Sequence, residues 1–140
     1  MASRKIEYLD PLLLPIYNRF KELLNGAGVD FIVTCTWRSP EEQNQLYAQG
    51  RTVENGVWTV TNKKKVVTWV RAGDSAHNYT RGGEPSARAF DIAILGAGKL
   101  NWDPRHKDWV TARRIGAECG LKNLFPAESA HFELPDWRKK

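Results

Sequence analysis

The chain has 140 residues, 41% of them hydrophobic and 26% charged, and its formal net charge at pH 7 is +5. This length allows one hydrophobic core, so we expect a single domain over residues 1–140. The apolar run Leu12–Leu14 is far too short to cross a bilayer, and we expect no insertion into a membrane. The positive charge favours a polyanionic partner without selecting one.

The first part of the chain predicts two helices around one strand. A helix is expected from Asp10 to Gly26, because an Asp-Pro start precedes apolar residues at spacings of three and four. The β-branched residues of 29–36 predict a buried strand. Ser39–Glu42 forms a capping box with proline at the first helical position, which predicts a second helix to about residue 49.

The rest of the chain predicts short strands and a third helix. Extended segments are expected at 57–60 and 66–70, on either side of a lysine-rich loop, and a clear strand is expected at 90–95. Apolar spacing and a terminating glycine predict a helix over 108–119, and a final short strand should contain residues 131–133. Without repeats or linkers, this order indicates a single α+β domain with a small, mainly antiparallel sheet flanked by helices.

Two histidines, His77 and His131, and the carboxylates Asp91 and Glu128 fall in two separated motifs, Ser75–Asp91 and Glu128–His131. Two imidazoles and one carboxylate give a zinc ion three protein ligands, and a further carboxylate can accept a proton from water in the fourth position. We assign His77, Asp91 and His131 as the zinc ligands and Glu128 as the base. Asp91 interrupts an apolar strand, where a buried carboxylate needs a metal or an arginine as partner.

Other roles stay open for these residues. Glu133 is a rival for the base, or it could orient a ligand, because it lies two residues beyond His131. A histidine in a polar turn, such as His77, is commonly only solvated, and His131 could be a core histidine. His106 is surrounded by charged residues and is interpreted as a surface loop residue.

Three further residues are candidates for substrate binding. Arg38 ends a predicted strand just before a capped helix, where its planar guanidinium could bind a carboxylate, polarise a carbonyl or simply pair with a nearby glutamate. Gln43 could line the same cleft, and Ser75 lies two residues before His77. The cysteines, Cys35 and Cys119, have no metal-type partner at short spacing and no histidine in their motifs, so we expect free thiols that are not nucleophiles.

Taken in order, five motifs resemble the zinc D-alanyl-D-alanine metallopeptidase family, and more narrowly its phage and bacterial L-alanyl-D-glutamate endopeptidase branch. These motifs are Trp37–Tyr47, Gly50–Thr52, Ser75–Asn78, Ala89–Asp91 and Glu128–Phe132. The resemblance implies the same ligands and base as above, an arginine that contacts substrate, and a small α+β fold around an antiparallel sheet. It covers approximately residues 30–134, and the combination is specific although each motif alone is not.

One departure from that family is the distance between the first histidine and the aspartate. Residues 78–90, thirteen in all, separate His77 from Asp91, which is more than the family usually has. The extra material, approximately Thr80–Ser86, suits a surface loop, and the entropy of closing a loop grows slowly with length. We therefore expect the ligands to converge, while the shape of the substrate subsites and the bond specificity stay open.

The resemblance implies a zinc peptidoglycan hydrolase that cleaves stem peptides, with an L-alanyl-D-glutamate endopeptidase acting as a phage-type endolysin as the first choice. The alternatives are a D-alanyl-D-alanine carboxypeptidase or dipeptidase and, in a different class, a non-catalytic zinc-stabilised wall-binding module. We expect a monomer without a separate wall-binding domain, made in the host cytoplasm without a signal peptide and released by a holin. Nucleic-acid binding is not favoured, because the six tryptophans are scattered along the chain.

Overall fold

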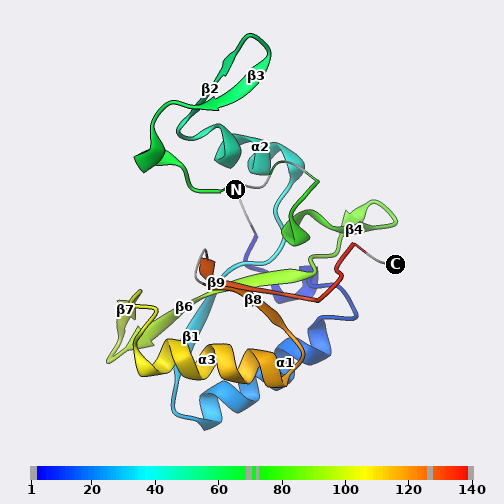
Figure 1. Ribbon diagram of the computed structural model, residues 1–140. Helices are drawn as coiled ribbons and strands as arrows, with labels where there is room; N and C mark the ends of the chain where they lie inside the picture. The colour runs from blue at the N-terminus through cyan, green and yellow to red at the C-terminus, as the bar shows by residue number, and fades with distance from the viewer. Residues whose placement is uncertain (1–2, 69–70, 72, 126–127, 139–140) are drawn as a thin grey trace.

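The computed structural model describes residues 3–68, 71, 73–125 and 128–138, and the side chain of residue 128 lies outside this description. Within these residues, a five-stranded sheet forms the centre of the fold (Figure 1). Its strands run in the order β1-β6-β9-β8, with β7 paired to β6, and every pairing is antiparallel. The bounds are β1 Asp30–Cys35, β6 Ala89–Gly96, β7 Lys99–Asn101, β8 Lys122–Leu124 and β9 Glu128–Glu133.

Two helices, α1 (Leu14–Gly26) and α3 (Lys107–Glu118), pack on one face of the sheet (Figure 1). Phe20 of α1 is fully buried, and its ring centroid lies 5.4 Å from that of Phe90 and 5.0 Å from that of Phe132. Gly116 of α3 allows this packing, since a Cβ atom there would lie 2.8 Å from Cε2 of Phe132. The aromatic core therefore fixes β6 and β9, the two strands that carry candidate ligands.

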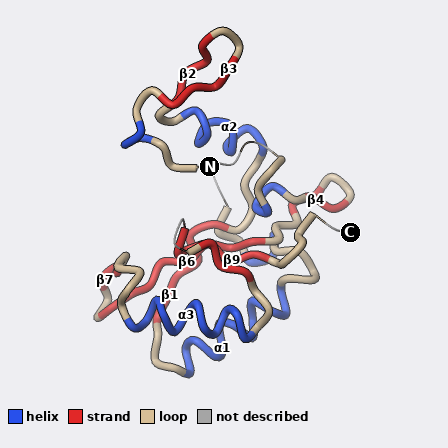
Figure 2. Tube along the Cα trace, in the orientation of Figure 1, coloured by secondary structure: helices blue, strands red, loops and turns tan. Residues whose placement is uncertain are grey.

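On the other side of the sheet lies α2 (Pro40–Ala48), followed by a hairpin of β2 (Arg51–Glu54) and β3 (Val57–Val60) that extends away from the sheet (Figure 2). Ser39 caps α2, because its side chain accepts a hydrogen bond from the backbone N–H of Glu42 at 3.1 Å. The predicted capping box therefore starts this helix where expected.

The short elements among the described residues include the 3₁₀ turns η1 (Ile6–Tyr8), η2 (Lys63–Lys65) and η3 (Ala76–Asn78), and a small hairpin. The hairpin pairs β4 (Thr80–Arg81) with β5 (Glu84–Pro85). It corresponds to the extra loop between His77 and Asp91 that the sequence indicates.

Buried Asp10 ties this small hairpin to the body of the protein. Its carboxylate accepts hydrogen bonds from Arg81 at 2.9 Å, Ser86 at 2.9 Å and Arg88 at 3.3 Å, and from the N–H of Leu12 at 2.8 Å. These donors lower the pKa of Asp10 although burial alone would raise it. The insertion is therefore an anchored hairpin.

The predicted α+β class with a mainly antiparallel sheet is confirmed. The helix expected from Asp10 begins at Leu14, and the preceding residues 11–13 form a turn. Of the extended segment expected at 66–70, residues 66–68 form no strand, and residues 69–70 lie outside the described part of the chain. None of the helices in the described residues has the length and apolarity needed to cross a bilayer.

Candidate metal centre

Three side chains from separate elements converge at one point: His77 of η3, Asp91 of β6 and His131 of β9. The pairing of β6 with β9 places Asp91 directly opposite His131. Nε2 of His77 lies 3.0 Å from Oδ1 of Asp91 and 3.1 Å from Nδ1 of His131, and this Nδ1 lies 3.1 Å from the same carboxylate oxygen. Two nitrogens and one oxygen thus form a nearly equilateral triangle.

The outer nitrogen of each imidazole has its own hydrogen-bond acceptor. Nδ1 of His77 lies 2.7 Å from the backbone carbonyl oxygen of Thr36, and Nε2 of His131 lies 2.8 Å from Oε1 of Glu133. A carbonyl can only accept, so Nδ1 of His77 donates, and the Glu133 carboxylate favours the same arrangement on His131. In the neutral rings, this leaves the two inner nitrogens with lone pairs that face each other and the Asp91 oxygen.

Such a cluster of lone pairs needs a cation, which can be a proton or a metal ion. Burial alone would lower the pKa of His77, but the adjacent Asp91 carboxylate outweighs it and raises this pKa well above its usual range. Burial would raise the pKa of Asp91, but the two histidines hold it far below its usual range. Both shifts favour a protonated histidine beside the Asp91 carboxylate when no metal is bound, and binding of a metal ion would displace that proton.

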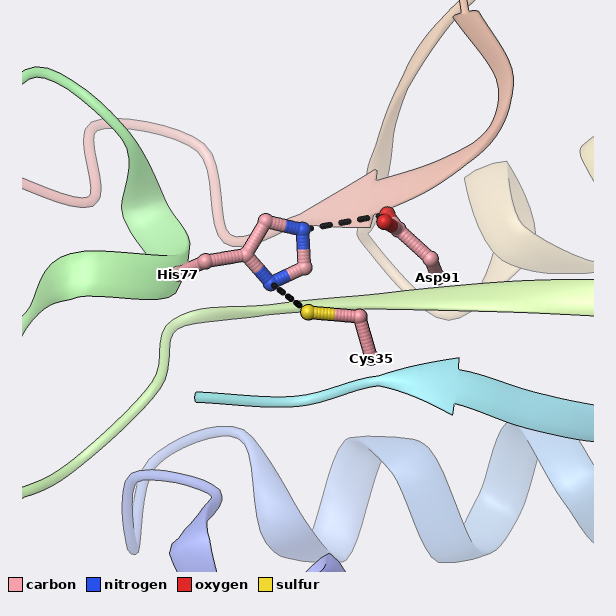
Figure 3. A group of neighbouring side chains, drawn as sticks. All are labelled: Cys35, His77 and Asp91. Carbon is pink, nitrogen blue, oxygen red and sulfur yellow. Dashed lines mark hydrogen bonds and ion pairs between the residues drawn. The ribbon is translucent and has the colours of Figure 1, made fainter. Parts of the chain in front are cut away.

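Cys35 is a further neighbour, because it lies opposite Asp91 in the pairing of β1 with β6. Its sulfur lies 3.6 Å from Nδ1 of His77, so that Cys35, His77 and Asp91 form a second possible metal-binding group (Figure 3). Nδ1 of His77, however, is already bonded to the Thr36 carbonyl at 2.7 Å, and it lies on the opposite side of the ring from the nitrogen that faces Asp91. The group that contains His131 is therefore the better ligand set.

The same geometry bears on nucleophilic chemistry, since thiol, imidazole and carboxylate lie in the order of a cysteine-protease triad. The sequence motifs had placed no histidine near Cys35. The carbonyl of Thr36 competes for the nitrogen that a thiolate would need, and Cys35 is only 4% exposed. The cysteine is a free, buried thiol beside the site, and Cys119 is free as well.

Arg38 reaches the site from the segment that follows β1. Its Nη2 lies 3.9 Å from Oδ2 of Asp91, and its Nη1 donates to Oε1 of Gln43 at 2.9 Å. Its backbone N–H donates to the carbonyl of His77 at 2.9 Å. Nε of Arg38 is buried and has no hydrogen-bond partner in the described part of the chain. The guanidinium is thus held beside the triangle, and its Nε–H is not engaged in a hydrogen bond with the described residues.

Gln43, a candidate for substrate binding, lies on α2 and contacts Arg38. Its side chain is fully buried on α2 and lies outside the lining of the hollows around the site. Its Oε1 accepts a hydrogen bond from Arg38 at 2.9 Å, and a direct contact of Gln43 with substrate stays a prediction. Ser75 lines the hollow beside His77, and its hydroxyl accepts the backbone N–H of His77 at 3.2 Å.

A hollow of about 300 Å³ opens beside the triangle, and a second, of about 270 Å³, adjoins it. Asp91 and His131 line both, and the first is also lined by Arg38, Asp74 and Glu133. The described residues of the small β4–β5 hairpin line neither, so they form no part of the walls of these two hollows. The two hollows therefore meet at Asp91 and His131.

The structure describes the side chain of only one of the two candidate bases, Glu133. Glu133 is bonded to His131, which matches a group that orients a ligand. The backbone of Glu128 lies in β9 and pairs with Leu124, whereas its side chain lies outside the described residues. The assignment of Glu128 as base therefore stays a prediction. His106, interpreted as a loop residue, caps α3 by accepting the N–H of Asp108 at 3.1 Å.

Comparisons with known proteins concern the chain as a whole. No family model matches the chain. The chain is 29% identical over 122 residues to the peptidoglycan L-alanyl-D-glutamate endopeptidase CwlK of Bacillus subtilis (strain 168), a match that covers 81% of this chain and 64% of that relative. The chain thus spans less than two thirds of the length of the curated relative it matches.

A solved structure is similar in fold. The L-Ala D-Glu endopeptidase ChiX of Serratia marcescens matches with a TM-score of 0.53 at 20% identity, over 96% of this chain and 89% of that one. This likeness shows a common fold. The chain is therefore a relative in sequence of one peptidoglycan L-alanyl-D-glutamate endopeptidase and shares its fold with another, which confirms the resemblance that its motifs indicated.

Proposed function

We propose that this protein is a zinc-dependent peptidoglycan hydrolase that cleaves stem peptides, with the L-alanyl-D-glutamate bond as its target. The observation that carries the proposal is the triangle of His77, Asp91 and His131, whose three inner atoms lie within 3.1 Å of one another. The similarity to CwlK supports the substrate class. Arg38 and an adjoining hollow give a peptide a place beside the triangle.

The donor set fits zinc. Two imidazoles and a carboxylate are a common set of three protein ligands for a catalytic zinc ion, and His77, Asp91 and His131 would hold it. A bound zinc ion would supply Lewis-acid chemistry, polarising a carbonyl and making water more acidic. The Thr36 carbonyl and the Glu133 carboxylate keep the two histidines in the tautomers that such binding needs.

The chain's own residues would then perform the remaining tasks. Glu128 accepts the proton of the attacking water and returns it to the leaving amine. Arg38 donates hydrogen bonds to the substrate, either to a carboxylate or to the carbonyl oxygen on which negative charge develops. The net charge of +5 would concentrate the protein on an anionic wall, an effect that salt should weaken.

The cellular role is part of the same proposal. We assign the protein to the phage-type endolysins, acting as a monomer after a holin has opened the membrane. The basic charge supports action on a wall polymer rather than on a neutral substrate. A lysis assay would test this role: the protein added to permeabilised bacteria should clear the suspension, and clearing should depend on the metal.

The activity itself is tested by digestion of purified peptidoglycan with metal-free protein, before and after addition of zinc. We expect new L-alanine carboxyl and D-glutamate amino ends by mass spectrometry, only with zinc. Release of terminal D-alanine would instead select the carboxypeptidase. Absence of any metal-dependent product across several wall types would leave a wall-binding module.

Matched variants link the activity to the site. His77→Ala and His131→Ala should abolish both zinc binding and cleavage. His106→Asn is the control, because it changes the remaining histidine while keeping a side chain that can cap α3. It should leave zinc binding and cleavage at the wild-type level.

A further inference from the structure

The second hollow has an aromatic wall. It is lined by Asp91, Trp102, Trp109, Ser129, Ala130 and His131, so it touches the proposed metal centre through Asp91 and His131 alone. Trp102 is 56% exposed, whereas Trp109 is 1% exposed. The two indole rings are stacked, with centroids 6.1 Å apart and planes inclined by 26°.

The wall is held in place before any ligand binds. Nε1 of Trp109 donates to the carbonyl of Asn101 at 2.7 Å, and this anchors the buried indole under the exposed one. The loop that carries Trp102 is shaped by side-chain turns: the N–H of Asp103 donates to Asn101 at 2.9 Å, and the N–H of Arg105 donates to Asp103 at 3.0 Å. Trp102 therefore presents a flat, supported apolar face beside the site.

The two hollows differ in charge. Apart from the shared Asp91 and His131, the described lining of the second hollow is neutral. The first hollow is also lined by Arg38, Asp74 and Glu133. A ligand with charged groups along its length would suit the first hollow, and a neutral ligand with a flat apolar face would suit the second.

The proposed substrate has this same asymmetry. On one side of the L-alanyl-D-glutamate bond, the stem peptide continues through residues that carry carboxylates. On the other side there is only the alanine, whose amine is acylated by the lactyl group of N-acetylmuramic acid, a neutral pyranose once that group is amidated. In intact peptidoglycan a sugar therefore lies one residue away from the bond that is cleaved.

We infer that the second hollow is a subsite for the N-acetylmuramyl sugar, which stacks on Trp102. The D-glutamate side of the peptide occupies the first hollow, which Arg38 lines. The inference rests on the proposed function. It implies that the enzyme prefers stem peptides that are still attached to sugar. It also implies that the terminal D-alanyl-D-alanine bond, which lies several residues from the sugar, is a poor substrate.

The test compares two substrates that differ only in the sugar: an N-acetylmuramyl stem peptide and the same peptide capped with a D-lactyl group. Wild type should show a kcat/KM about tenfold higher for the muramyl substrate, the size expected of one stacking contact. Trp102→Ala should remove this preference and leave kcat/KM for the capped peptide unchanged. Trp102→Phe should retain part of it.

Trp58→Ala is the matched control, since Trp58 is a partly exposed tryptophan on β3 outside the lining of the second hollow. It should keep the preference. The inference is overturned if wild type cleaves both substrates equally well, if Trp102→Ala keeps the preference, or if Trp102→Ala lowers kcat/KM for both substrates to the same degree.

A binding measurement separates this inference from the proposed function. N-acetylmuramyl-L-alanine, the product that carries the sugar, is titrated by calorimetry into the zinc-treated wild type and Trp102→Ala. Binding that depends on Trp102, without cleavage of either substrate, would support the subsite and overturn the endopeptidase. Cleavage without binding that depends on Trp102 would overturn the subsite alone. Absence of both would overturn both.

Discussion

Glu133 is expected to raise zinc affinity by holding His131, and its substitution tests the arrangement of the proposed metal centre. Its Oε1 lies 2.8 Å from Nε2 of His131, and both side chains are almost fully buried. A hydrogen bond to a charged partner contributes about 1.5–3 kcal/mol, and loss of such a partner behind a metal ligand weakens metal binding about 10- to 100-fold. Glu133→Gln keeps an acceptor oxygen and should lie at the low end of this range, whereas Glu133→Ala should lie at the high end.

The assay is competition for zinc between the protein and a chromophoric chelator, with cleavage rates measured at saturating zinc. Glu118→Gln is the matched control, because Glu118 is an exposed glutamate on α3 whose ion pair, with Arg114, lies away from the metal centre. Unchanged zinc affinity in both Glu133 variants would refute the orienting role. If Glu133→Gln also abolished turnover at unchanged affinity, Glu133 rather than Glu128 would be the base.

Three further predictions concern the base, the anchor of the insertion and the core. Glu128→Gln should bind zinc like wild type and lose cleavage by at least about 100-fold, measured at saturating zinc; retained activity would contradict its role as base. Asp10→Asn leaves the buried Arg88 without its carboxylate partner and should lower the free energy of unfolding by about 3 kcal/mol at pH 7. Because the pKa of Asp10 is lowered on folding, this contribution is complete above the unfolded pKa near 3.8 and is lost as the pH falls through the folded value. Urea unfolding should therefore show the difference shrinking below about pH 4, and a constant difference would contradict the assignment. Gly116→Ala places a methyl group against Phe132 and should cost about 1–3 kcal/mol, so an unchanged thermal midpoint would contradict the tight packing.

The parts of the fold that local patterns predicted are those with enough residues to show a period. The helices α1, α2 and α3 and the strands β1 and β6 each carry apolar spacing, caps or β-branched runs that act within one segment. The strands β4, β5, β7 and β8 have two or three residues each, which is too short for any period. Their existence depends on tertiary contacts, such as the anchoring of Arg81 by Asp10.

In the candidate site, the sequence predicted the converging side chains but not the groups that surround them. The motifs around His77, Asp91 and His131 indicated the residues that converge, and their types indicated the chemistry. No local pattern could reveal the Thr36 carbonyl behind His77, or the sulfur of Cys35, because both contacts link β1 and its end to η3 across more than forty residues.

Glu133 could be placed near the site from the sequence, whereas Trp102 could not. The position of Glu133, two residues after His131 on one strand, was a usable signal that both side chains share a face. Trp102 had no such signal, because its place beside Asp91 depends on how the loop after β7 packs on α3.

X-ray absorption at the zinc edge, on protein loaded with one equivalent of zinc, tests the metal centre most directly. The ligand set of His77, Asp91 and His131 predicts a shell of nitrogen and oxygen atoms only, with the outer-shell scattering of two imidazoles. A sulfur atom at about 2.3 Å would show that Cys35 binds the metal and would contradict the proposed centre.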